Sequence, residues 1–253
     1  MPTPDVTSAP SPASTVVVVP TFQERENIEP FLRAVRAAAP DVDVLIVDDN
    51  SPDGTADLAE KLADDVGRVE VLRRAVKDGL GNAYRAGFAV ALDRGYDQII
   101  QMDADLSHDP GSIADLRARL DQGADVAIGS RYVPGGATPH WPLRRRLLSR
   151  WGNRYTTLLL GLPVRDATSG FRAYKATTLR EIRFDTTRAN GYAFQMEVAA
   201  RLVDHHCQVE EVPITFTDRV RGTSKMSAAI MVESLALATR WGIRNRLGRL
   251  RHR

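Results

Sequence analysis

The sequence has little of what several large classes of protein depend on. Cys207 is the single cysteine among 253 residues, so no disulfide can form within the chain, which fits a reducing compartment such as the cytoplasm. No segment combines the length and apolarity of a membrane-spanning helix. The first residues carry no Lys or Arg ahead of an apolar region, which argues against a secretory signal. We therefore expect a cytoplasmic location.

Two common nucleotide-binding signatures are also missing. No phosphate-loop lysine motif occurs. Gly79-Leu80-Gly81 could begin a glycine-rich dinucleotide fingerprint, but Tyr84 stands at the third glycine position and the stretch does not follow the first predicted strand. The net charge is only +2, and the arginines near the C-terminus are not interleaved with aromatic residues. We therefore expect no nucleic-acid partner.

What is present indicates one α/β domain. The apolar share of 43% and the charged share of 26% are ordinary for a soluble globular protein. A chain of this length can bury a substantial core. Residues 1–14 are rich in Pro, Ser, Thr and Ala, which predicts a disordered tail. The ordered domain is predicted at 15–226, and a basic amphipathic helix at 227–253. We find no internal repeat.

Short apolar runs alternate with stretches of helical periodicity along the chain. Strands are predicted at 15–19, 42–47, 69–72, 98–102, 126–129 and 209–216, and residues 166–174 are predicted as a turn that leads into a strand. Helices are predicted between these strands, including one or two at 143–160 and one at 192–205. We expect Pro20 to close the first strand and Thr55 to cap the helix that follows the second. This alternation implies a mostly parallel central sheet with helices on both faces.

Two aspartates follow the strand predicted at 98–102. Asp103 and Asp105 are spaced i, i+2, so continued strand geometry would place both on one side of the chain and Ala104 on the other. Ligands of open α/β sheets bind beyond the carboxyl ends of the strands. Two carboxylates this close repel, and Mg²⁺ or Mn²⁺ shared with substrate phosphates would supply the counter-charge. The alternative is a pair of solvated loop aspartates.

Other strand ends carry polar side chains that can reach the same place. Asp48 and Asp49 end the second predicted strand, which makes the simple loop interpretation less attractive. Arg131 follows the strand predicted at 126–129, although a surface arginine fits the sequence equally well. The sequence thus predicts acidic side chains with a cation beside them at the carboxyl edge of the sheet.

Nine segments, taken in order, resemble one family. They are Pro20-Thr21-Phe22-Gln23-Glu24, Val47–Thr55, Gly79-Leu80-Gly81, Met102–His108, Gly129-Ser130-Arg131-Tyr132, Thr168–Arg172, Glu211–Ile214, Asp218-Arg219 and Ser224-Lys225. Together they resemble the dolichol- or polyprenol-phosphate mannose synthases of glycosyltransferase family two. The resemblance covers about residues 15–230.

This resemblance implies a GT-A nucleotide-sugar domain that transfers mannose from GDP-mannose to a polyprenyl monophosphate, with inversion. The products would be polyprenyl phosphate β-mannose and GDP. It implies catalytic roles for Asp103, Asp105 and Arg131, and a Mg²⁺ or Mn²⁺ ion on Asp105 and Ser107. The nucleotide-sugar contacts that it implies are Pro20, Phe22, Glu24, Val47, Asp49, Asp103, Ala104, Asp105, Arg131, Arg219 and Lys225.

The chain departs from the family pattern at two places. Phe22 and Gln23 stand where Tyr and Asn are common, and Phe22 lacks the hydroxyl but keeps an aromatic face for stacking. Ser107 stands where some members have Gln, so its shorter side chain would reach the ion through water. An acceptor phosphate with a second pKa of about 6 needs no strong base, which explains why no catalytic histidine is evident.

The acceptor's hydrocarbon tail would lie in a bilayer, so the enzyme must meet a membrane. The basic segments at 143–160 and 227–253 could dock on anionic lipid at the cytoplasmic face, or a separate membrane subunit could recruit the chain. Simpler explanations are a solvated helix face and packing of the last helix on its own domain.

Two other functions stay open at this point. One is a family-two transferase that uses another nucleotide sugar, for example UDP-glucose with polyprenyl phosphate. The other is a catalytically inactive scaffold of the same fold, against which the intact Asp103, Asp105 and Arg131 argue.

Overall fold

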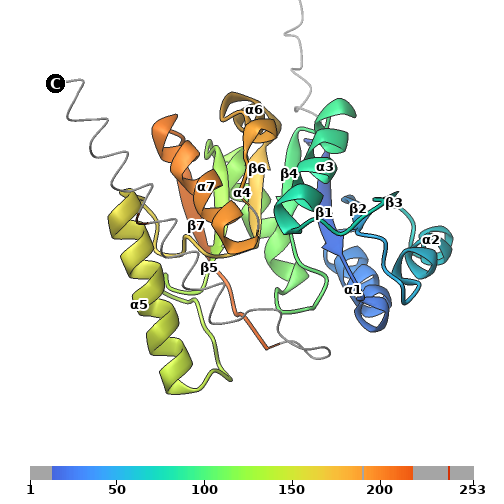
Figure 1. Cartoon of the computed structure of the whole chain (residues 1–253), viewed down its shortest axis with the longest axis horizontal. Coiled ribbons are helices and arrows are strands. Elements are labelled where there is room, and N and C mark those ends of the chain that lie inside the picture. Colours follow the sequence, from blue (N-terminus) through green and yellow to red (C-terminus); the bar gives the residue numbers. More distant parts are fainter. Residues whose placement is uncertain (1–12, 190, 219–238, 240–253) are drawn as a thin grey trace, which may run out of the picture.

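The computed structural model describes residues 13–189, 191–218 and 239. Most of the predicted tail, Arg219, Lys225 and the helix predicted at 227–253 lie outside the described residues. A seven-stranded sheet with the order β3-β2-β1-β4-β6-β5-β7 forms the centre (Figure 1). Its strands are β1 (Thr15–Thr21), β2 (Asp43–Asp48), β3 (Val69–Arg73), β4 (Gln98–Gln101), β5 (Val126–Ser130), β6 (Arg172–Lys175) and β7 (Val209–Pro213).

Among these strands β6 alone runs antiparallel to its neighbours, so the predicted mostly parallel sheet is confirmed. β1 and β2 read as nearly continuous Val, Leu and Ile runs because helices cover both faces of the sheet. Because neither face of the sheet is open to solvent along these strands, polar residues do not alternate with apolar ones in β1 and β2.

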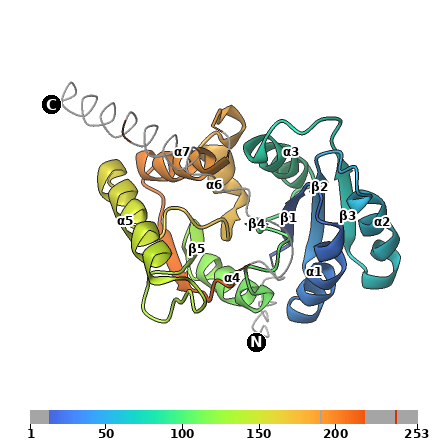
Figure 2. The ribbon, with the colours of Figure 1, turned by 60° about the horizontal axis from the view of Figure 1, so that its bottom comes forward.

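Helices cover both faces of the sheet, as Figure 2 shows. They are α1 (Arg25–Ala38), α2 (Thr55–Val66), α3 (Leu80–Asp93), α4 (Ile113–Asp121), α5 (Leu143–Leu160), α6 (Ala176–Glu181) and α7 (Gly191–Asp204), with short 3₁₀ helices η1 (Pro110–Ser112) and η2 (Phe184–Thr186). One core cluster joins the sheet to α1, α2 and α4, and the other joins it to α3, α6 and α7. The sequence analysis missed α6, a short helix directly after β6.

The first strand does not stop at Pro20 as expected but continues to Thr21. Val18 O accepts from Met102 N on the β4 side, and Thr21 O accepts from Asp49 N on the β2 side. Alternation along the strand turns Pro20 toward β4, whose ladder with β1 ends at the Val18–Gln101 pair. The missing N–H of proline therefore breaks no hydrogen bond there.

Thr55 does not cap α2, because the residue at the cap position is Gly54, in a left-handed conformation. Thr55 Oγ1 instead donates to Asp53 Oδ1 at 2.6 Å and accepts from Glu24 N at 3.0 Å. The fully buried threonine thus joins the connection after β2 to the connection after β1. It positions the candidate site rather than the helix end.

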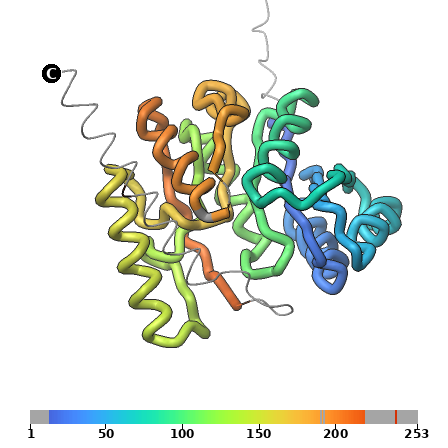
Figure 3. Tube along the Cα trace, in the orientation of Figure 1, coloured from blue at the N-terminus to red at the C-terminus, as the bar shows by residue number. Residues whose placement is uncertain are grey.

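The single helix α5 lies beside β5 and β7 at the edge of the molecule, and Figure 3 follows the chain into it through residues 131–142. Asn153, Thr156, Thr157 and Leu160 are its buried positions. Within the described part of the chain, no helix has the length and apolar character that crossing a membrane requires.

Candidate active site

The carboxyl ends of the parallel strands share one edge of the sheet, and the connections that leave them carry the predicted site residues. We divide this edge in two. The β1–β3 half contains Phe22, Glu24, Asp49, Arg74 and Lys77. The β4–β7 half contains Asp103, Asp105, His108, Arg131 and Asp166.

Asp48 ties the ends of β1 and β2 together. Its Oδ2 accepts from Thr21 Oγ1 at 2.9 Å and from Ser51 Oγ at 2.6 Å, and its Oδ1 accepts from Ser51 N at 2.8 Å. Ser51 Oγ also accepts from Gln23 N at 3.0 Å. With its hydrogen bonds used in this way, Asp48 has a structural role, and Asp49 is the acidic residue left for a ligand.

Asp49 is 6% exposed, and burial raises the pKa of its carboxyl although Arg74 acts against this. Arg74 Nη1 donates to Asp49 Oδ1, and Arg74 Nη2 donates to Asp78 Oδ1 at 2.5 Å. Among the described residues nothing donates to Asp49 Oδ2. The sequence analysis missed Arg74 and Asp78, which lie in the connection between β3 and α3.

Phe22 and Glu24 lie in the connection that follows β1. Lys77 Nζ lies 3.7 Å from the centroid of the Phe22 ring, a cation–π contact. Glu24 Oε2 accepts from Asn27 Nδ2 at 2.7 Å at the start of α1. Val47, which we predicted to be a nucleotide contact, is fully buried in the core beneath this half, where it pairs with Pro20 in the ladder.

The chain turns immediately after β4, so the strand alternation that we invoked for Asp103 and Asp105 does not apply. β4 ends at Gln101, and a turn at residues 104–106 gives Leu106 a φ of 59°. Asp103 is half-buried and its Oδ1 accepts from Tyr84 OH at 3.2 Å. Asp105 is 4% exposed and its Oδ1 accepts from Ser107 N at 3.0 Å. A turn, not a strand, therefore arranges the two carboxylates.

The donor set suits a divalent ion that takes few ligands from the protein. The described residues include no group of three or more His, Cys, Asp or Glu side chains that could hold an ion by themselves. Ser107 Oγ is buried beside Asp105 and has no hydrogen-bond partner in that part of the chain. Mg²⁺ and Mn²⁺ commonly take one or two carboxylates and complete their shell with water and substrate phosphates. Asp103, Asp105 and Ser107 fit such an ion.

His108 is a buried residue whose role the sequence analysis did not foresee. Its ring lies 5.2 Å from that of Phe171 and 5.1 Å from that of Phe216, and it is 2% exposed. Burial lowers its pKa to about 4, so the imidazole is neutral near pH 7. Its Nδ1 has no hydrogen-bond partner among the described residues. The sequence pattern gave no indication of this burial, because the contacting rings of Phe171 and Phe216 lie more than 60 positions away along the chain.

Arg131 lies at the end of β5, where the sequence predicted it, and it is paired with Asp166. Its Nε and Nη2 each donate to Asp166 at 2.7 Å, and Nη2 also donates to Thr168 Oγ1 at 2.7 Å. Asp166 is fully buried. Burial opposes its ionisation, but the Arg131 cation outweighs burial and holds the pKa of this carboxyl below its usual range. The pair fixes the orientation of the guanidinium.

Aromatic rings surround the Arg131 guanidinium. Its centre lies 5.2, 5.8 and 5.5 Å from the rings of Tyr132, Trp141 and Phe216. Trp141 Nε1 donates to Asp218 Oδ1 at 3.0 Å, which anchors the chain after β7 beside this group. This apolar, aromatic wall distinguishes the β4–β7 half from the β1–β3 half.

The loop before β6 is shaped by a fully buried arginine. Arg172 donates to the carbonyl oxygens of Ser169 at 2.9 Å, Ala167 at 2.6 Å and Gln195 at 3.4 Å. A Cβ at Gly170 would lie 3.4 Å from Asp103 Oδ2 and 4.0 Å from His108 Nε2. The loop therefore passes close to both residues, which places it against the Asp103 side of the site.

With this geometry in view, comparison with known proteins identifies the family. A family model described as glycosyl transferase family 2 matches residues 16–183. The chain belongs to glycosyltransferase family 2. The polyprenol monophosphomannose synthase of Mycolicibacterium smegmatis is 47% identical over 94% of this chain and 90% of that protein. The undecaprenyl-phosphate mannosyltransferase of Micrococcus luteus is 45% identical over 94% of this chain and 98% of that protein.

Solved structures confirm the predicted GT-A-type α/β fold of this family 2 chain. The glucosyl-3-phosphoglycerate synthase of Mycobacterium tuberculosis, solved with phosphoglyceric acid, superimposes with a TM-score of 0.67 at 18% identity, over 89% of this chain and 79% of that one. The mannosyltransferase of Pyrobaculum calidifontis, solved with GDP-Man and Mn²⁺, gives a TM-score of 0.60 at 16% identity, over 94% and 67%. At these identities the likeness concerns the fold alone.

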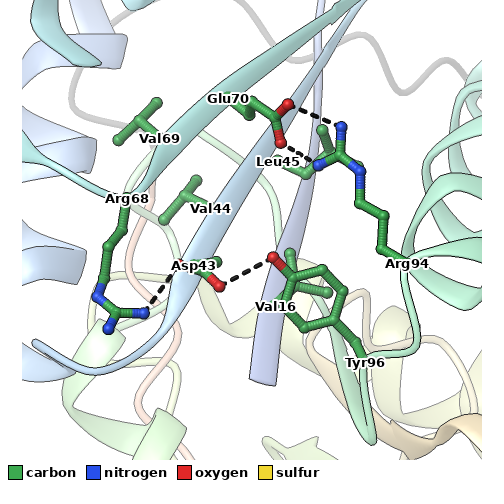
Figure 4. A pocket seen from close by; sticks show the side chains of 9 residues that line it. All are labelled: Val16, Asp43, Val44, Leu45, Arg68, Val69, Glu70, Arg94 and Tyr96. Carbon is green, nitrogen blue, oxygen red and sulfur yellow. Dashed lines mark hydrogen bonds and ion pairs between the residues drawn. The ribbon is translucent and has the colours of Figure 1, made fainter. Parts of the chain in front are cut away.

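A cavity of about 240 Å³ lies at the other edge of this family 2 domain, near the amino ends of β1, β2 and β3 (Figure 4). Its charged side chains are already bonded to one another: Arg68 to Asp43, and Arg94 to Glu70. It lies at the opposite end of these strands from Asp49 and Phe22, so it is separate from the candidate active site.

Proposed function

We propose that this chain transfers mannose from GDP-mannose to a polyprenyl monophosphate and releases GDP. The observation that carries the proposal is the similarity, over nearly the whole chain, to two curated proteins named as mannosyltransferases of polyprenol or undecaprenyl phosphate. The mannosyltransferase of Pyrobaculum calidifontis, which shares the fold of this chain, was solved with GDP-Man and Mn²⁺. We propose the same donor, GDP-mannose, and a divalent ion such as Mn²⁺ for this chain.

The two halves of the site divide this reaction. Phe22, Glu24 and Asp49 meet the nucleoside, and Asp103 and Asp105 meet the diphosphate and the sugar. Asp105, with Asp103 and Ser107 Oγ, would hold Mg²⁺ or Mn²⁺, which when bound neutralises charge on the departing diphosphate. Arg131, oriented by Asp166, meets a phosphate. Arg219 and Lys225 are proposed as further phosphate contacts.

The chemistry needs no general base from the protein. A phosphomonoester with a second pKa of about 6 is mostly dianionic near pH 7, so an acceptor oxygen can attack C1 of mannose directly. The C1–O bond to the diphosphate breaks, its electron pair leaves on GDP, and the attack from the opposite side inverts C1. Because its pKa is about 4, His108 is neutral and adds no charge beside the leaving group.

The decisive experiment is a product assay. The purified chain is incubated with GDP-mannose, Mg²⁺ or Mn²⁺ and a short-chain polyprenyl phosphate, and mass spectrometry of the lipid should show the gain of one hexose. Asp105→Ala should lower turnover by about 10²-fold or more, whereas the exposed control Asp115→Ala should not. A UDP-glucose arm tests the alternative donor. No gain of hexose from GDP-mannose would overturn the assignment, and full turnover without any divalent ion, or by Asp105→Ala, would overturn the role of the ion.

Helix α5 supports peripheral contact with the cytoplasmic face of a membrane. It contains five arginines and no acidic residue. Its exposed apolar side chains recur at helical spacing and are Leu143, Leu147, Leu148, Trp151 and Leu158, each more than half exposed. A basic amphipathic helix of this kind binds anionic lipid surfaces. A separate membrane subunit would be an alternative anchor.

Vesicle flotation at low salt tests the membrane contact. The chain should float with vesicles that contain anionic lipid, and the double variant Leu147→Glu/Leu148→Glu should not. Val76→Glu is the matched control, because Val76 is 61% exposed but lies away from α5. If the double variant floats as well as the control, α5 is not the contact.

A further inference from the structure

The connection between β3 and α3, residues 74–79, places basic side chains in very different situations. Arg73, at the end of β3, binds two carboxylates of α2. Arg74 forms ion pairs with Asp49 and Asp78. Lys77 forms no ion pair with any residue in the described ranges, and its ammonium group lies 3.7 Å from the centroid of the Phe22 ring. Its charge is therefore available to a ligand.

This connection contacts two of the residues that the family resemblance assigns to the nucleotide pocket at the ends of β1 and β2. Lys77 lies on Phe22, and Arg74 donates to Asp49. Three strand ends thus contribute an aromatic face, a buried carboxylate and an unneutralised ammonium group to one place. The sequence pointed only to the first two.

These three groups match the chemistry of guanine. An aromatic ring provides a stacking face, a carboxylate accepts from N–H groups, and an ammonium donates to carbonyl oxygen or ring nitrogen. Guanine has N1–H and N2–H₂ donors adjacent to its O6 and N7 acceptors, and lysine is a common partner of O6 and N7. Uracil has a single N–H donor, and adenine has no ring N–H donor on that edge.

We propose that Lys77 is a base-recognition residue, which donates to the O6/N7 edge of guanine while Asp49 accepts from the N1–H and N2–H₂ side. The four-carbon stem of Lys77 lets its ammonium move from the Phe22 ring to the edge of a base that stacks there. Arg74 is the positioning residue that orients the Asp49 carboxylate. The inference rests on the proposed GDP-mannose donor.

Titration calorimetry of the full chain with GDP and Mn²⁺ tests this role. Lys77→Met should weaken GDP binding about tenfold, and Lys77→Arg should retain most of the affinity. Lys61→Met on α2 is the matched control, because Lys61 is an exposed lysine outside the site, and it should bind GDP as the unaltered chain does. Unchanged thermal unfolding would show that the variants are folded.

Base analogues make the test specific to an edge of guanine. The unaltered chain should bind GDP more tightly than 7-deaza-GDP, which lacks N7, or 6-thio-GDP, which keeps N1–H but replaces O6 with a weaker sulfur acceptor. Lys77→Met should lose at least one of these preferences. An equal loss of UDP and GDP affinity, or a loss that disappears when guanosine replaces GDP, would assign Lys77 to the phosphates and overturn the proposal.

The same titrations separate this inference from the proposed function. If the unaltered chain does not bind GDP, the GDP-mannose assignment fails. If it binds GDP and Lys77→Met binds equally well and with the same preferences, the assignment stands and the role of Lys77 is refuted.

Discussion

Asp49 and Asp166 are both buried and both paired with an arginine, yet their carboxyl pKa values shift in opposite directions. Burial raises the pKa of Asp49. Arg74 does not fully offset this effect, because it reaches Asp49 through one nitrogen and also binds another carboxylate. Burial also disfavours the charged form of Asp166, but here Arg131 donates through its backbone N–H and through both Nε and Nη2. The pKa of Asp166 is therefore lowered.

The difference shows which half of the site is complete without a ligand. Asp166 has its hydrogen bonds satisfied by the protein, so the Arg131 pair is a finished structural unit that presents one cation in a fixed orientation. Asp49 has one oxygen to which no described residue donates, and its ionised form is poorly stabilised. A ligand with N–H groups would complete it. The β1–β3 half is arranged to gain contacts on binding, and the Arg131–Asp166 pair is arranged to hold its shape.

The largest expected effect comes from breaking the completed pair. Asp166→Asn leaves a buried guanidinium with a neutral partner, and loss of one member of a buried ion pair typically costs about 3–5 kcal/mol of stability. Asp49→Asn removes a charge that burial disfavours and keeps an oxygen that can accept from Arg74, so it should cost at most about 1 kcal/mol. Urea unfolding of both variants measures the contrast. Equal losses would mean that the two pairs are equivalent and that the comparison is mistaken.

The opposite pKa shifts predict opposite effects of pH on stability. The folded pKa of Asp166 lies below its unfolded value, so its contribution is present above about pH 4 and is lost as pH falls through the folded value. The folded pKa of Asp49 is raised, so its contribution is lost as pH rises through that value. Between pH 3 and 6, Asp166→Asn should therefore flatten the rise of unfolding free energy with pH, and Asp49→Asn should steepen it.

Carboxyl ¹³C titration of the folded chain gives an independent measurement. Asp49 should titrate above the ordinary aspartate value of about 3.9, and Asp166 below it. If Asp166 titrates at or above the ordinary value, Arg131 does not stabilise its charge, and the stability argument fails with it.

The strand-end argument placed Asp49, Asp103, Asp105 and Arg131 at one edge of the sheet, because the carboxyl ends of parallel strands must meet. The family resemblance, and not the strand pattern, added Phe22 and Glu24. The strand-end argument could not predict partners, because Asp166 reaches Arg131 across 35 positions of chain.

Turns and buried polar contacts were the other gaps in the sequence analysis. The alternation argument for Asp103 and Asp105 failed because β4 stops at Gln101 and a turn follows. His108 and Arg172 read as ordinary polar residues in the sequence, and only the folded structure shows that both are buried. Local pattern predicts where a strand ends but not how the next five residues fold.

The smallest effect that we expect is a change in the pH dependence of GDP affinity, and it tests which half of the site holds the base-binding carboxylate. Asp49 faces Arg74, Asp78 and Asp48, so Arg74 is the cation that acts against its protonation. Arg74→Met should raise the pKa of Asp49 further, and GDP affinity should then fall several-fold more between pH 8 and pH 6 than in the unaltered chain, because a protonated Asp49 no longer accepts two hydrogen bonds.

Arg73→Met is the matched control for Arg74→Met, since Arg73 is the neighbouring arginine but binds α2. Its GDP affinity should follow the pH dependence of the unaltered chain. Arg131→Met, if it folds, should likewise leave that dependence unchanged, because its carboxylate partner is Asp166 and not Asp49. A steeper pH dependence in Arg131→Met than in Arg74→Met would show that the base-binding carboxylate lies in the β4–β7 half, and the division of the site would have to be reversed.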